Sequence, residues 1–303
     1  MAANNLRIVY NNLAIGSTLT ASSQASAALS VSNLLNDYKS VPWRSLTGTI
    51  TNEARANLVV TFPQDKTVTL VLLPYTNMSA LTTIRIKGWT GTAPTLSGTT
   101  NAPTLTTTGA TQVFDTGIVK AFDYDPLGTF EWGTQVLAPT GYSGENSYIM
   151  AWIPKEVSQP CRHITIELVD TSNFDQYIQV SFIVLGDYWS PKFNTKFGLS
   201  QGQEDKSSNF RNEAGDLLVS KSFKYKTLRF DMSYLTPSDR TEMSRIFRIA
   251  GSTSRIFISL FPENYSDPSE EHMYQLYGKI VKLPGIENHI YKMYKTTIDI
   301  EEV

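Results

Sequence analysis

The stretch NLVVTFPQDKTVTLVLLP, residues 57–74, decides the fold class of this chain. In its first half Leu58, Val60 and Phe62 alternate with Val59 and Thr61, which is the spacing of side chains on one inward face of a β-strand. The same spacing recurs at Val68, Leu70 and Leu72. Pro63-Gln-Asp stands between the two runs and predicts a turn, so the stretch predicts two consecutive strands.

Alternation with a period of two continues outward from this stretch as far as residue 300 and favours an all-β class. Further strands are expected at residues 84–87, 148–153, 164–168, 178–184, 228–234, 256–261, 274–283 and 293–300. The composition agrees, because 41% of the residues are hydrophobic, 11% are aromatic and only 18% are charged. That balance suits half-buried strands better than surface helices.

A chain of 303 residues is long enough for two domains with separate cores. We place the first domain at residues 1–186 and the second at residues 223–303. Residues 187–222 between them are polar and rich in turn residues, and we interpret them as a linker that includes an exposed hairpin or arm. Residues 90–111, rich in Thr, Ser, Gly and Pro, predict a long surface excursion of the first domain.

One helix is predicted in the second domain. Thr236 fits the N-cap, Pro237 fits the first helical position, and Gly251 follows as a stop signal. An apolar stripe with helical spacing lies between them, at Met243, Ile246, Phe247 and Ala250. We expect this stripe to pack on a sheet, and Arg240, Arg245 and Arg248 to form a solvated face.

The charge and the cysteine count exclude several classes of partner. The formal net charge is −2 and no long run of Lys or Arg is present, so nucleic acid is not expected as a partner. Cys161 is the one cysteine, which excludes an internal disulfide and indicates a small buried apolar residue. No signal-peptide core and no apolar run of about 20 residues is found, so we expect a soluble protein without membrane insertion or Sec export.

The sequence offers no recognisable catalytic set, and we expect no enzyme activity, no cofactor and no metal. His163 lies on the polar face of a predicted strand, and His272 and His289 lie in polar, turn-like segments. Phosphate loops, dinucleotide fingerprints and nucleophile elbows are not found. Four carboxylates gather in one loop-rich region, at Asp115, Asp123, Asp125 and Glu131. They leave a bound cation open, and a glycosidase as a third alternative.

Aromatic residues cluster in or beside the predicted loops of the first domain. Such rings can stack on the apolar face of a sugar. Core packing explains most of them, but Trp89, Trp132 and Tyr142 are the candidates for glycan contact.

Two stretches of the chain resemble known families. The first domain resembles the discoidin-like, galactose-binding-like jelly roll that recurs in phage tail proteins. The resemblance rests on Asn33-Leu-Leu, Val41-Pro-Trp-Arg-Ser45, the strand pair around residues 58–73, and Cys161-Arg-His-Ile-Thr-Ile-Glu-Leu-Val-Asp170 leading to Gly186. These are scaffold features rather than ligand contacts, so the resemblance implies a jelly-roll β-sandwich and only weakly a sugar.

The second domain is similar to the core domain of phage distal tail and tail-tube-related proteins. The matching segments are residues 225–234, 237–250, 255–261, 274–283 and 294–301. The resemblance implies a small β-barrel or split barrel with one flanking helix, whose copies join in a ring, with a hexamer favoured.

Together the two resemblances imply a structural, homo-oligomeric component of a virion tail tip or baseplate, assembled in the host cytoplasm. Its partners would be copies of itself and neighbouring tail-tube and tail-tip proteins. The alternative is a carbohydrate-binding module or adhesin that recognises a glycan of the host surface.

Overall fold

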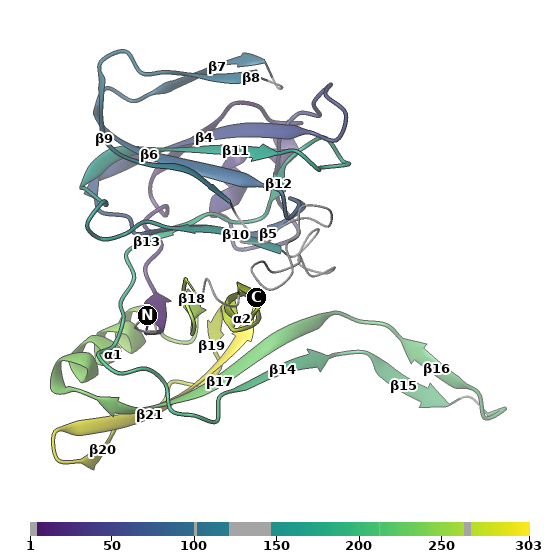
Figure 1. Cartoon of the computed structure of the whole chain (residues 1–303). Helices are drawn as coiled ribbons and strands as arrows, with labels where there is room; N and C mark the ends of the chain where they lie inside the picture. Colours follow the sequence, from purple (N-terminus) through teal and green to yellow (C-terminus); the bar gives the residue numbers. More distant parts are fainter. Residues whose placement is uncertain (1–4, 100–101, 121–146, 212, 264–267) are drawn as a thin grey trace, which may run out of the picture. The chain divides into compact units, whose positions relative to one another are not determined.

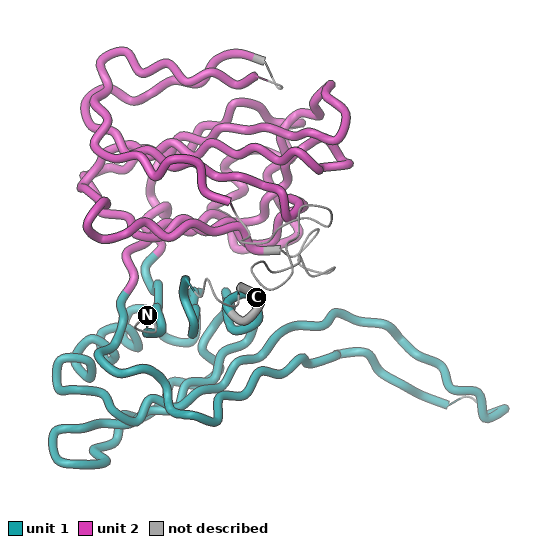
Figure 2. Tube along the Cα trace, in the orientation of Figure 1, with its two compact units in different colours: residues 1–11, 189–264, 270–303 teal, residues 12–188, 265–269 magenta. Residues whose placement is uncertain are grey.

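The computed structural model describes residues 5–99, 102–120, 147–211, 213–263 and 268–303. The chain divides into two compact units (Figure 2). The sandwich unit comprises Asn12–Tyr188 and Tyr265–Ser269, and the arm unit comprises Met1–Asn11, Trp189–Asn264 and Glu270–Val303. The division at residue 188 lies close to the predicted boundary. The first eleven residues, however, belong to the arm unit, whereas the sequence placed them in the first domain.

The sandwich unit contains two antiparallel β-sheets (Figure 1). The first has the order β2 (Thr18–Ala21), β4 (Ala54–Lys66), β11 (Cys161–Asp170), β6 (Thr83–Gly91) and β9 (Ala110–Lys120). The second has the order β10 (Ser147–Trp152), β5 (Leu70–Thr76), β12 (Gln179–Val180) and β3 (Trp43–Arg44), with β13 (Val184–Gly186) also paired to β5. Two short 3-10 helices, η1 (Ala27–Leu29) and η2 (Val31–Leu35), precede β3. The expected jelly-roll type of β-sandwich is confirmed.

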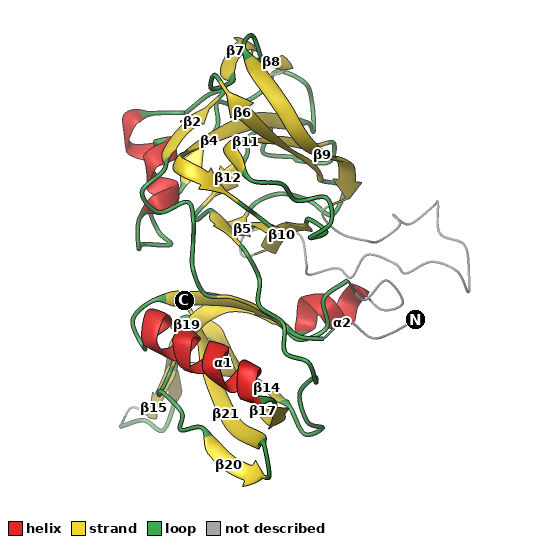
Figure 3. Ribbon diagram, turned by 90° about the vertical axis from the view of Figure 1, so that its left-hand side faces the viewer, coloured by secondary structure: helices red, strands yellow, loops and turns green. Residues whose placement is uncertain are grey.

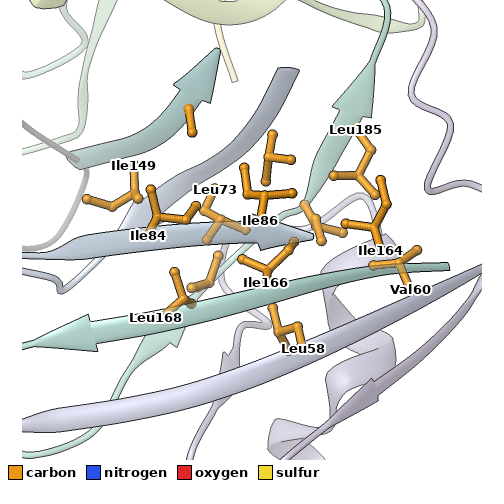
Figure 4. Packing of buried hydrophobic residues seen from close by; sticks show 14 of the residues in the cluster. Leu58, Val60, Leu73, Ile84, Ile86, Ile149, Ile164, Ile166, Leu168 and Leu185 are labelled. Atoms are coloured by element: carbon orange, nitrogen blue, oxygen red, sulfur yellow. The ribbon is translucent and has the colours of Figure 1, made fainter. Parts of the chain in front are cut away.

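Apolar side chains from both sheets fill the space between them (Figure 4). Leu58 of β4 and Ile166 of β11 come from the first sheet, and Leu73 of β5 and Ile149 of β10 come from the second. All four side chains are fully buried. Each contributes about 1.5–3 kcal/mol relative to an exposed side chain, so the alternating pattern read in the sequence is what holds the sheets together.

A hairpin covers part of the outer face of the first sheet. It consists of β7 (Thr95–Thr99) and β8 (Ala102–Thr106) and contacts β4, two strands away from β6 where it starts. Asn57 Nδ2 of β4 donates a hydrogen bond to the carbonyl oxygen of Pro103 at 3.4 Å. The Thr-rich excursion is therefore on the surface, as expected, but it folds back and buries polar side chains beneath it.

The arm unit contains one open antiparallel sheet. Its order is β1 (Arg7–Val9), β18 (Arg255–Ser259), β19 (Gln275–Ile280), β21 (Met293–Glu302), β17 (Lys224–Leu235) and β14 (Ser200–Asp205), and β20 (Glu287–Ile290) also pairs with β21. The two edge strands, β1 and β14, are not paired with each other, so the sheet is open like a barrel that is split along one side.

Helix α1 (Pro237–Ala250) lies across this sheet (Figure 3). The predicted cap is present, because the Thr236 side chain accepts from the Asp239 amide and the Asp239 side chain accepts from the Thr236 amide. Gly251 ends the helix at φ 56°. The apolar stripe joins a core with side chains of the sheet: Met243, Ile246 and Ala250 with Phe230, Ile258 and Ile298.

Three local features differ from the sequence-based expectation. Pro63 does not make a turn, because β4 continues to Lys66. The pairing of β4 with β11 shifts register between Cys161 and His163, and a strand tolerates proline at such an irregularity. Residues 178–184 form parts of two short strands rather than one. A second helix, α2 (Pro268–Met273), was not predicted. Among the described residues, no helix is long and apolar enough to span a membrane.

Candidate functional site

The arm is a two-stranded ribbon that projects from the sheet of the arm unit (Figure 1). We use this name for residues 200–229: β14 pairs with the first half of β17, and beyond it β15 (Ser208–Arg211) pairs with β16 (Leu217–Ser220). We refer to β15 and β16 as the arm tip. Every residue of the arm tip is exposed. A two-stranded ribbon alone is marginally stable in water, so the arm suits contact with another surface.

Apolar side chains lie on both faces of the arm tip. Phe210 is directly opposite Leu218, so these two side chains share one face. Leu217 and Val219 alternate with Leu218 and point to the other face. Their exposed fractions are 56% for Phe210 and Leu217, 42% for Leu218 and 52% for Val219. Contiguous exposed apolar groups of this kind mark interaction sites.

A polar cluster fixes the ribbon where the arm leaves the sheet. The Tyr225 hydroxyl and the Lys206 ammonium both donate to Glu204 Oε2, at 2.6 Å and 2.9 Å. These donors hold the pKa of Glu204 below its ordinary value, and the hydrogen bond to the carboxylate raises the pKa of Tyr225. The Phe223 ring lies 6.1 Å from the Tyr225 ring, centroid to centroid. The cluster sets the register of β14 against β17, because Glu204 and Tyr225 are directly paired.

Exposed apolar side chains are more frequent in the arm unit than in the larger sandwich unit, among the residues that the structure describes. Besides the four of the arm tip, the exposed large apolar residues of the arm unit are Phe193, Phe197, Phe223, Tyr234, Ile249, Met273, Val281, Leu283, Ile290 and Tyr291. Scattered exposed apolar residues are normal, but their concentration in one unit indicates an interaction surface. The run Leu217–Val219 within a polar linker was the sequence signal for it.

The arm unit also has a surface pocket of about 360 Å³. It lies where β17, β20 and β21 meet, and its lining includes Lys196, Asp231, Glu287, His289 and Lys295. Lys295 and Glu287 form an ion pair at 2.9 Å. The lining is polar and of mixed charge, so it has no preference for an anion or a cation.

The aromatic residues predicted for glycan stacking are not brought together. Trp89 is only 6% exposed, and its indole nitrogen donates to Thr165 Oγ1 at 3.0 Å beneath the outer face of the sheet. A sugar needs an open ring face to stack on, so Trp89 is corrected to a packing residue. Trp132 and Tyr142 lie outside the described residues.

Two of the histidines are also corrected. His163 is 5% exposed rather than a surface residue. Its nitrogens contact Thr61 Oγ1 at 2.9 Å and the Gly91 carbonyl oxygen at 3.2 Å, so neighbouring strands of the same sheet supply its partners. His272 is buried in α2, and burial lowers its pKa to about 4. His289 is exposed and lines the pocket.

The carboxylates expected near one another are only partly described. Asp115 accepts from Arg85 through both oxygens, at 3.0 Å and 2.6 Å, and this hydrogen bonding lowers the pKa of Asp115. Asp123, Asp125 and Glu131 lie outside the described residues. Within the described ranges, no group of three His, Cys, Asp or Glu side chains is placed to hold a metal ion. Cys161 is buried, as expected, and burial raises its pKa to about 12.

A loop cluster of the sandwich unit was not anticipated. Phe174 is 80% exposed, and its neighbour Asp175 accepts a hydrogen bond from Asn77 Nδ2 at 3.0 Å. Arg44 lies 4.2 Å above the Tyr177 ring and donates twice to Gln179 Oε1. An exposed aromatic ring in a polar loop is a feature that sugar-binding surfaces use. The signal in the sequence was one aromatic residue between Asn173 and Asp175 in a turn.

The comparisons with known proteins give no family. No protein-family model matches the chain, and no curated protein matches it. Among solved structures, the chain is similar to chitosan-binding module 1 of a chitosanase/glucanase from Paenibacillus sp. IK-5, with 17% identity over 58% of this chain and 99% of that chain and a TM-score of 0.35.

Two further solved structures are similar at the same level. The family 32 carbohydrate-binding module of NanJ from C. perfringens, in complex with galactose, has 10% identity over 60% of this chain and 99% of that chain, with a TM-score of 0.33. A Ruminococcus gnavus GH29 fucosidase has 13% identity over 60% of this chain and 27% of that chain, with a TM-score of 0.34. The structural neighbours thus include carbohydrate-binding modules.

Proposed function

We propose that the chain is a structural subunit that assembles through its arm. The observation that carries this proposal is the arm tip, an exposed ribbon with Phe210 and Leu218 on one face and Leu217 and Val219 on the other. Burial of apolar surface is the main favourable term in protein association, and the arm tip buries none of these four side chains on its own chain. A second surface that covers it would be stabilised by that burial.

The place of assembly that we propose is the tail tip of a tailed phage. The support is the resemblance of the arm unit to ring-forming distal tail proteins, with the capped helix α1 and the split-barrel sheet as its elements. A ring also accounts for β14, an edge strand whose outer backbone groups face no further strand of the described sheet. Closed rings remove exposed edges of this kind.

The size of the purified chain in solution tests the assembly proposal. In the matched variant, residues 206–223 are replaced by Asn-Gly, a two-residue turn that joins paired strands. We expect the full chain to form oligomers as its concentration rises in sedimentation velocity, and the shortened chain to stay monomeric with unchanged circular dichroism. A full chain that stays monomeric at all concentrations, or a shortened chain that assembles equally well, would contradict the proposal.

The proposed location has a separate test. An antibody raised against the purified chain should label one end of the tail in particles of the phage that encodes it. Particles that contain the chain elsewhere, or lack it, would refute the proposed location. The assembly proposal does not depend on this result.

A second candidate function is carbohydrate binding by the sandwich unit. It is favoured by the loop cluster, in which Phe174 is exposed and the next residue, Asp175, accepts a hydrogen bond from Asn77. A glycan array followed by titration calorimetry tests it, with Phe174→Ala as the variant and Ile118→Ala, at a similarly exposed site of the same unit, as the control. Binding lost with Phe174→Ala alone supports the candidate, and an array without hits removes it.

A further inference from the structure

The pocket of the arm unit lies on the face of the sheet that points away from the core. We call this cavity of about 360 Å³, where β17, β20 and β21 meet, the polar pocket. Asp231 and Thr297 are directly paired and alternate with core residues, so their side chains lie on the opposite face of the sheet. The Thr297 hydroxyl donates to Asp231 Oδ1 at 2.6 Å, and the Lys196 amide donates to the Asp231 carbonyl oxygen at 2.9 Å.

Two further contacts fix the walls of the polar pocket. Lys295 of β21 and Glu287 of β20 form an ion pair at 2.9 Å. The buried Thr296 side chain donates to the Gly285 carbonyl oxygen at 3.0 Å. Each segment that lines the pocket is thus bonded to β17 or β21. Binding sites for small ligands are usually preformed in this way.

Several polar groups of the lining have no partner within the part of the chain that the structure describes. The Lys196 ammonium, the Ser233 hydroxyl and the His289 ring make no hydrogen bond or ion pair there. The second carboxylate oxygen of Asp231, Oδ2, accepts no hydrogen bond from these residues either. The polar pocket therefore offers both donors and acceptors to a ligand.

The charges of the lining cancel, which restricts the class of ligand. The lining holds two lysines, Lys196 and Lys295, and two carboxylates, Asp231 and Glu287. A phosphate would need an excess of positive charge, and a metal ion would need a cluster of ligands that the described residues do not form. An apolar ligand would leave the polar groups of the pocket unpaired. A neutral ligand with several hydroxyl groups satisfies the donors and the acceptors without these costs.

Exposed aromatic residues lie next in sequence to the lining. Phe197 follows Lys196 directly and is fully exposed, and Tyr291 lies two residues after His289 and is 83% exposed. The negative face of an aromatic ring disfavours a carboxylate, whereas it stacks well on the apolar face of a sugar. Polar groups with aromatic rings beside them therefore favour a sugar over a zwitterion such as a free amino acid.

We propose that the polar pocket binds a neutral sugar residue of a glycan. Lys196, Ser233 and His289 donate to its hydroxyl groups, and Asp231 accepts from them. The site belongs to the arm unit and is separate from the loop cluster of the sandwich unit. Its ligand is bound whether or not the chain assembles through its arm, so the proposal goes beyond the proposed function.

A glycan array probed with the full chain, followed by titration calorimetry on the glycans it selects, tests the proposal. The pocket variant carries Lys196→Ala and His289→Ala, both at exposed positions. The matched control carries Lys192→Ala and Lys282→Ala, two exposed lysines of the same unit outside the lining. We expect the pocket variant to bind about tenfold or more weakly and the control to bind normally. An array without hits, or a pocket variant that binds like the control, overturns the proposal.

The variant Phe174→Ala separates the polar pocket from the loop cluster. If Phe174→Ala abolishes glycan binding and the pocket variant binds normally, the glycan is held by the sandwich unit and the proposal is wrong. Loss of binding in the pocket variant, with an unaffected control, supports the polar pocket whatever the effect of Phe174→Ala.

Salt dependence distinguishes a neutral sugar from a charged ligand. The affinity for a neutral glycan should be the same at low and high salt, because no ion pair between protein and ligand is screened. Selection of sulfated or carboxylated glycans alone, with an affinity that falls steeply as salt is added, would contradict the proposal. Binding of free amino acids in place of glycans would contradict it as well.

Histidine NMR keeps the test decisive if a variant misfolds, because it uses the unchanged chain. The three histidine rings are those of His163, His272 and His289, and only His289 is exposed and lines the polar pocket. Titration with a glycan selected on the array should shift the ring signals of His289 and leave the other two in place. Saturating glycan that leaves the His289 signals unmoved would show that the sugar binds elsewhere.

Discussion

Phe210 and Leu218 lie directly opposite each other in the β15–β16 ladder and belong to neither hydrophobic core of the described residues. Buried pairs of this size cost about 2–5 kcal/mol when truncated, whereas exposed positions change stability by less than about 0.5 kcal/mol.

We therefore predict that Phe210→Ser with Leu218→Ser leaves the free energy of unfolding of the monomer nearly unchanged. Urea unfolding at low protein concentration measures it. A loss above about 2 kcal/mol would show that the arm tip is a packed part of its own chain.

The contact between Tyr225 and Glu204 predicts how the base of the arm responds to pH. The pKa of Glu204 is lowered, so the stability that its carboxylate contributes to the folded arm is present above the ordinary glutamate pKa. This stability is lost as the pH falls through the lowered pKa. The pKa of Tyr225 is raised, so its proton stays to higher pH than in an exposed tyrosine. NMR titration with labelled tyrosine should show the Tyr225 pKa falling in Glu204→Gln; an unchanged value would contradict the contact.

Removal of the helix cap should destabilise the arm unit. Thr236→Ala deletes the acceptor for the Asp239 amide and is expected to cost about 1 kcal/mol. Ser244→Ala, at an exposed position of the same helix, is the control and should stay within about 0.5 kcal/mol. Equal effects of the two substitutions in chemical denaturation would speak against the capping box.

Buried His272 should make folding sensitive to mild acid. Its pKa in the folded chain is about 4, below the ordinary value of 6.5, so the unfolded chain binds more protons between these values. Stability contributed by this site is complete above pH 6.5 and falls as the pH drops toward 4, by up to roughly 3 kcal/mol. His272→Gln should flatten this dependence in urea unfolding between pH 7.5 and 5, and the same slope in both proteins would contradict the prediction.

Local patterns in the sequence predicted those parts of the fold that depend on near neighbours. The helix at Pro237–Ala250 was predictable because its cap, its apolar stripe and its stop signal lie within sixteen residues. Most core strands were predictable from their alternation. Strand β1 was not, because three residues carry no pattern and their partner, β18, lies about 250 positions later.

Surfaces that become covered by distant segments were predicted poorly. His163 and Thr165 alternate with apolar residues and so indicate a solvent-facing side, but both side chains are buried, and the β7–β8 hairpin contacts the adjacent strand β4. Trp89 was a stacking candidate because of its place beside a loop, but its side chain is buried and bonds to Thr165. The arm was predictable as an exposed segment, whereas the directly opposed Phe210 and Leu218 required the register of the ladder.

Amide hydrogen exchange of the arm tip, followed as a function of protein concentration, tests the central claim most directly. An isolated two-stranded ribbon opens readily, so the amides of β15 and β16 should exchange fast in the dilute monomer. We predict that their protection rises many-fold when the chain assembles, while the protection of β4 and β11 of the sandwich stays unchanged. Assembly that leaves the arm tip exchanging as fast as in the monomer would contradict the account.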